Sequence, residues 1–87
     1  MADADPADRK RRAIRILRQL ADRLTAKATD EQKELIRQAV THLDHAEAFV
    51  NTNFSEDAAA RTVVTQQIDI ANHLLAIIDR ELGRDNP

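Results

Sequence analysis

The three histidines of this 87-residue chain, His42, His45 and His73, are its clearest candidates for metal chemistry. The spacing His42-x-x-His45 places two imidazoles within reach of one cation, and a third ligand would complete a zinc-type site. If the segments around His42 and His73 pair as antiparallel helices, these two side chains lie roughly 10 Å apart along the axis. They therefore share no metal within one chain. We expect no cofactor, and a histidine-based metal-binding bundle, completed by a second chain, is kept as an alternative.

The sequence gives little indication of a catalytic site. No Ser/His/Asp set or carboxylate pair stands out on neighbouring turns. The Glu-x-x-His pairs of di-iron bundles are missing, since neither Glu34 nor Glu47 precedes a histidine by three residues. With no cysteine the chain has no thiol nucleophile or thiolate zinc site, and its single glycine excludes glycine-rich phosphate loops. We expect a protein that is not an enzyme.

A second candidate site is basic. Residues 1–27 carry a net charge of +4 and residues 28–87 a net charge of −6, so the total of −2 conceals a division of charge. Four arginines, Arg11, Arg12, Arg15 and Arg18, share the helix face opposite Leu17 and Leu24. Such a stripe binds acidic protein surfaces or phosphate backbones.

We predict an acidic protein partner for these arginines. Nucleic acid is an alternative that we do not favour, because the net charge is negative and no Tyr or Trp is present to stack on bases. A third interpretation is that the basic segment pairs with the acidic remainder inside one molecule.

Helical elements must position these groups. Alanine occurs fifteen times, leucine, arginine, glutamate, glutamine and aspartate fill much of the rest, and no useful stretch alternates with a period of two, so the chain is predicted to be all-α. Helix starts are indicated by Asp5-Pro6, by the capping box from Thr29 to Gln32, and by Ser55, while Gly83 indicates a stop. The predicted fold is an up-down-up antiparallel three-helix bundle with helices at about 6–27, 30–52 and 56–82.

One domain is expected over residues 6–83, between a disordered acidic N-terminus at 1–5 and a disordered tail at 84–87. The connection at Lys27-Ala28-Thr29 has no glycine or proline to break the helix, so one helix continuous through Ala28 is left open.

Each predicted helix carries an apolar stripe with helical spacing. The stripes are Ala13, Leu17, Leu20, Ala21, Leu24 and Ala28; Ile36, Ala39, Leu43, Ala46 and Val50; and Ala60, Val64, Gln67, Ala71, Leu74 and Ile78, with Ile68, Leu75 and Leu82 beside the third. Gln67 is the one polar member, and an amide at such a position often fixes register or oligomeric state.

Several apolar residues lie off these stripes. Val63, Ile70 and Ile77 recur every seven residues, and Phe49 lies off the second stripe. One explanation is that the third helix needs a wide apolar arc to touch two neighbours. The other is self-association through Phe49, Val63, Ile70 and Ile77, which gives a homodimer with coiled-coil-like packing in which the second and third helices of two chains form a four-helix core.

The sequence thus predicts a small regulatory protein, adaptor or partner-occluding inhibitor that acts by protein binding. No apolar run approaches the ~18 residues of a spanning helix, and the acidic start does not resemble a signal peptide, so we expect no membrane association and a cytoplasmic location. An excess of arginine over lysine, together with many alanines, suggests a bacterial or phage origin.

Overall fold

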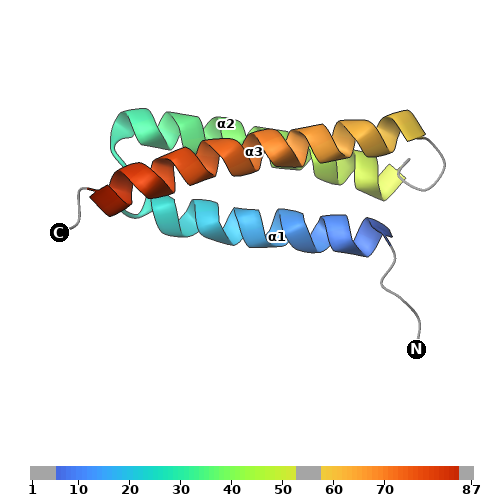
Figure 1. Ribbon diagram of the computed structural model, residues 1–87, viewed down its shortest axis with the longest axis horizontal. Helices are drawn as coiled ribbons and strands as arrows, with labels where there is room; N and C mark the ends of the chain where they lie inside the picture. The colour runs from blue at the N-terminus through green and yellow to red at the C-terminus, as the bar shows by residue number, and fades with distance from the viewer. Residues whose placement is uncertain (1–5, 53–57, 85–87) are drawn as a thin grey trace.

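The computed structural model describes residues 6–52 and 58–84, and within these ranges the chain forms three helices. They are α1 (Pro6–Thr25), α2 (Asp30–Thr52) and α3 (Ala58–Arg84). Figure 1 shows α1 and α3 running in the same direction and α2 running opposite to both. Each helix packs against the other two, and α2 and α3 pack most extensively. The predicted all-α, up-down-up three-helix bundle is confirmed.

The break between α1 and α2 is formed without glycine or proline. After α1 ends, the N–H of Lys27 donates to the carbonyl of Leu24 (3.0 Å), which closes a tight turn. The capping box then starts α2: the N–H of Gln32 donates to the Thr29 hydroxyl (3.2 Å), and the N–H of Thr29 donates to Oε1 of Gln32 (2.9 Å). The two helices are therefore separate rather than continuous through Ala28.

Two helix ends lie two residues from their predicted positions, and the predicted helix stop at Gly83 is wrong. The first helix ends at Thr25 rather than at residue 27, because Ala26 and Lys27 form the turn. The third helix continues through Gly83 to Arg84 instead of stopping at residue 82. Gly83 has no positive φ, so it does not adopt the left-handed conformation of a glycine stop. Leu82 packs against the core and holds this last turn in place.

Several sequence predictions fall outside the described residues. They are the disordered N-terminus at 1–5, residues 85–87 of the disordered tail predicted at 84–87, the caps at Asp5 and Ser55, and the start of the third helix at residue 56. Arg84, the first residue of that predicted tail, is helical instead.

The core matches the predicted stripe on α2 and shifts on the other two helices. On α2 the whole predicted stripe is buried, from Ile36 to Val50. On α1 the prediction missed Ile14, which is only 1% exposed. On α3, Ile68 and Leu75 are buried, while Gln67 and Leu74 are only half-buried. The shift on α3 follows from its two neighbours, because its apolar arc is centred between α1 and α2.

None of the helices that the structure describes is long and apolar enough to cross a membrane.

Candidate functional site

The residues predicted to mediate self-association lie on one side of the α2–α3 hairpin. Phe49 on α2 is half-buried and packs against the core. On α3, Val63 and Ile77 are half-buried, and between them Ile70 is 41% exposed. Ile70 is one of two large hydrophobic residues in the described chain that are this exposed; the other is Ile16 on α1. The structure thus leaves an apolar strip on α3 outside the core.

This side of the hairpin is turned away from α1. On α2, the side chain of Asp44 contacts α1, and His42 lies two residues, or about 200° of helix rotation, from it. On α3, Asp79 lines a pocket together with α1 residues, and Ile70 lies nine residues, or about half a turn net, from Asp79. The strip is therefore open to solvent and is not covered by α1.

A hydrogen bond joins the two helices in the middle of this side. Nδ1 of His42 lies 2.6 Å from Oε1 of Gln67, and because an amide oxygen only accepts, Nδ1–H of His42 is the donor. Both side chains are half-buried. Gln67 thus lies at the edge of the core and not at its centre, where the predicted stripe had placed it.

The middle of this side, over residues 35–49 of α2 and 63–77 of α3, carries no charged side chain, whereas Glu31, Arg80 and Glu81 continue the same heptads at the end near the α1–α2 turn. We define the α2/α3 face as the half-buried or exposed residues within these two ranges that lie on the side away from α1: Leu35, Gln38, His42, His45, Phe49, Val63, Gln66, Gln67, Ile70, His73, Leu74 and Ile77. None of them is Asp, Glu, Lys or Arg, although 32% of the chain is charged. Lysine, glutamate and aspartate are depleted at protein interfaces, most strongly at their centres.

Sequence reasoning found the apolar members of this face but missed its lack of charge. The signal was present in the spacing of uncharged polar residues, since Gln38 and His45 on one helix, and Gln66 and His73 on the other, are each seven residues apart. With a heptad period, such residues share one side of a helix.

All three histidines lie on this face, but they form no metal centre within one chain. His45 and His73 are exposed, and His42 is half-buried with Nδ1 engaged by Gln67. Over residues 6–52 and 58–84 no group of three or more His, Cys, Asp or Glu side chains is arranged to hold a metal ion.

The predicted basic face is divided between two environments. Nη2 of Arg18 donates to Asp44 (2.6 Å) and to Glu47 (3.3 Å) on α2. Arg11 pairs with Asp8 (2.9 Å) on its own helix, and its Nε donates to Oδ1 of Asn51 (3.1 Å) on α2. These two arginines therefore link α1 to α2, as the interpretation of pairing within one molecule expects.

The other two arginines of the predicted face, Arg12 and Arg15, are exposed. Neither forms an ion pair with another residue in the part of the chain that the structure describes. Their availability to a partner stays a prediction.

No protein-family model matches this sequence, and comparisons with curated proteins and with solved structures found no significant match.

Proposed function

We propose that this protein is a small, non-enzymatic interaction module that self-associates through the α2/α3 face. The observation that carries the proposal is the combination of exposed apolar side chains with an absence of charge on that face. A surface that is meant to stay in water is normally covered with charged side chains, as the rest of this chain is. A contiguous apolar strip without charge is instead typical of a surface that is buried by a partner.

A second copy of the chain is the partner that fits this face. In a two-fold dimer the same surface meets itself, so an uncharged face finds an uncharged face and no charge is buried without a partner. The seven-residue spacing of Val63, Ile70 and Ile77 is the repeat of helices that pack side by side at a shallow angle. Two α2–α3 hairpins joined in this way form a four-helix core with α1 on the outside.

The composition of the bundle supports the same proposal. Six of the sixteen buried hydrophobic residues are alanines, among them Ala39, Ala46 and Ala71. Alanine contributes little apolar area, and bundles of this size commonly gain stability by oligomerisation. Burial of Ile70 and its neighbours in a dimer adds apolar contact that one chain alone lacks.

Light scattering on three purified proteins tests the proposal. We expect the wild type to have the mass of a dimer at about 50 µM, on the assumption of a dissociation constant of order 1 µM. Ile70→Glu places a carboxylate at the centre of the interface and should be monomeric, because the dimer would bury two like charges. Ala76→Glu is the matched control: it adds the same charge to an exposed position on another side of α3 and should remain a dimer.

A monomeric wild type would contradict the proposal, as would a dimer that Ile70→Glu and Ala76→Glu affect equally. Circular dichroism shows whether each variant keeps its helices, so that loss of the dimer is separated from loss of the fold.

Within this proposal the protein acts by binding, as a regulator, adaptor or inhibitor that covers a partner surface. A cytoplasmic location and a bacterial or phage origin stay predictions from composition.

Nucleic-acid binding has less support than protein binding. Arg11 and Arg18 contact α2, and the chain that carries the remaining exposed arginines has a net charge of −2, which disfavours a phosphate backbone. Salt-dependent binding of a DNA duplex that is lost in Arg12→Glu/Arg15→Glu would reverse this preference.

A further inference from the structure

A second surface, on α1, combines cations with apolar side chains. Its residues recur with spacings of three and four along one side of the helix and into the turn that follows it: Arg9, Arg12, Ile16, Leu20, Arg23 and Lys27. We call this set the basic stripe. Ile16 is 52% exposed, Leu20 is half-buried, and the four cationic residues are exposed. The stripe differs from the predicted basic face, with which it shares only Arg12.

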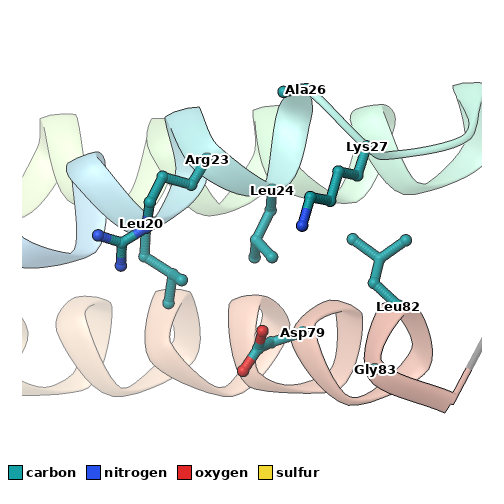
Figure 2. A pocket seen from close by; sticks show the side chains of 8 residues that line it. All are labelled: Leu20, Arg23, Leu24, Ala26, Lys27, Asp79, Leu82 and Gly83. Carbon is teal, nitrogen blue, oxygen red and sulfur yellow. The ribbon is translucent and has the colours of Figure 1, made fainter. Parts of the chain in front are cut away.

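The stripe ends in a pocket between α1 and α3 with a volume of about 580 Å³. Figure 2 shows the leucine side chains of Leu20 and Leu24 reaching from α1 toward α3, and that of Leu82 reaching back from α3. Arg23 and Lys27 stand at the α1 side of the pocket and Asp79 at the α3 side. The pocket therefore has apolar walls with charge at its edge.

The backbone holds Lys27 at this position. The bond from the Lys27 N–H to the Leu24 carbonyl (3.0 Å) fixes the turn, and in Figure 2 the Lys27 amino group extends into the gap between Leu24 and Leu82. The α3 side of the pocket is open at Gly83, where an added Cβ would meet no atom within 4 Å.

The cationic residues of the stripe are not paired with acidic side chains within the described chain. None of Arg9, Arg12, Arg23 and Lys27 forms an ion pair with another residue that the structure describes, in contrast to Arg11 and Arg18 on the α2 side of the same helix. The stripe has four cationic residues, and Asp79 is the one acidic residue that lines its pocket. The surface is complementary to an anionic partner that also brings apolar groups.

We propose that the basic stripe and its pocket bind an acidic amphipathic helix of another protein. The apolar residues of that helix would cover Ile16 and enter the pocket, and its flanking carboxylates would face the four cations. From Arg9 to Lys27 the stripe covers about 18 residues, or roughly 27 Å, which is a suitable length for such a helix. The inference rests on the proposed role as an interaction module but does not require self-association, because the stripe and the α2/α3 face lie on different sides of the molecule.

The apolar pocket favours a protein helix over the other anionic partners. A nucleic-acid backbone needs the cations but makes no use of a leucine-lined pocket, and the chain has no Tyr or Trp for base stacking. A membrane surface binds broad apolar faces, whereas here a single exposed isoleucine lies among the cations.

Fluorescence anisotropy with a synthetic probe tests this proposal. The probe is a labelled 18-residue peptide with leucines at helical spacing on one face and glutamates on both flanks. We expect saturable binding to the wild-type protein with a dissociation constant on the order of 10 µM at 150 mM salt. A peptide of the same composition in scrambled order should bind at least tenfold more weakly, since it lacks an apolar face.

Matched variants locate the site. Arg23→Glu should weaken binding at least tenfold, whereas Arg15→Glu, the same change at an exposed position of α1 off the stripe, should change it less than twofold. Gly83→Leu, which fills the open side of the pocket without touching a charge, should weaken binding about fivefold or more. Circular dichroism confirms that each variant remains helical.

Several results would overturn the proposal. They are no saturable binding at 200 µM protein, equal losses in Arg23→Glu and Arg15→Glu, and equal binding of the scrambled peptide. Tighter binding of a DNA duplex or of vesicles containing anionic lipid than of the peptide would assign the stripe to those partners instead. Ile70→Glu, which tests self-association, should still bind the peptide, so the two proposals can fail separately.

Discussion

At the scale of single residues, the start of α2 is fixed by a reciprocal pair of hydrogen bonds. Thr29 and Gln32 satisfy each other's backbone N–H groups, which have no partner inside the helix. Gln32 is also the one buried polar residue in the described chain, and its Nε2 donates to Oε2 of Glu81 on α3 (3.0 Å). One side chain thus caps a helix and ties the first turn of α2 to the last turns of α3.

Thr29→Ala should therefore lower the free energy of unfolding by about 1 kcal/mol, the usual effect of removing a threonine cap. Thr41→Ala is the control, because Thr41 is exposed within α2 and its hydroxyl bonds only to the carbonyl of Arg37 in the preceding turn (3.0 Å). We expect Thr41→Ala to change stability by less than about 0.5 kcal/mol in urea titrations. Equal effects of the two substitutions would show that the capping bonds do not stabilise the bundle.

Gly83 gives a second prediction at this scale. Because it is helical, has no positive φ and has open space where a Cβ would lie, Gly83→Ala should raise the free energy of unfolding by about 0.5 kcal/mol. A left-handed glycine stop would give the opposite sign, since alanine is strained at positive φ. Urea denaturation of the two proteins decides between the helical and the left-handed conformation.

These residues show what sequence alone can settle locally. The capping box was predictable because Thr29 and Gln32 interact with each other and need no distant partner. The helical conformation of Gly83 was not predictable, because it depends on Leu82 packing against the core. The burial of Ile14 was also missed, although Ala7, Ile14 and Ala21 recur every seven residues along one side of α1.

At the scale of elements, opposite charges link α1 to α2. Arg18 lies between Asp44 and Glu47 of α2, and Arg11 reaches Asn51 one further turn along. These contacts follow one edge of α1, while the basic stripe follows its other edge beside α3. The division of charge between the first segment and the rest of the sequence thus serves the pairing of helices on one edge and leaves cations exposed on the other.

A double-mutant cycle should detect this link. For Arg18→Ala and Asp44→Ala we expect a coupling of about 0.5 kcal/mol, because both side chains are partly exposed and such pairs contribute little in water. The coupling should decrease in 1 M salt, where exposed charges are screened. The same cycle with Arg15 in place of Arg18 should give no coupling, and a coupling of equal size there would contradict the assigned pairing.

Sequence patterns predicted the helices better than their contacts. The stripe on α2 was correct throughout, since all five of its members are buried. On α1 and α3 the apolar residues extend around more of the helix, so their spacing alone did not decide which of them face the core. The separation of α1 from α2 was also left open, since the turn contains no residue that breaks a helix.

At the scale of the whole molecule, the bundle presents two surfaces of different character. The α2/α3 face is uncharged and is proposed to pair with a second copy of itself, and the basic stripe is cationic and is proposed to bind an acidic partner. The sequence predicted apolar members of the first, Phe49, Val63, Ile70 and Ile77, and of the second it predicted only Arg12, as part of a different basic face. The second depends on which arginines α2 engages and on a pocket between α1 and α3, and both arise only when the helices are assembled.

The central claim is that two copies of the chain meet through the α2/α3 face. Isotope-filtered nuclear Overhauser measurements on a mixture of ¹³C-labelled and unlabelled protein test it most directly, because they record only contacts between different molecules. We predict intermolecular contacts from the methyl groups of Val63, Ile70 and Ile77 to protons of the same face on the other chain. The absence of intermolecular contacts at millimolar concentration, or contacts confined to α1, would contradict the account.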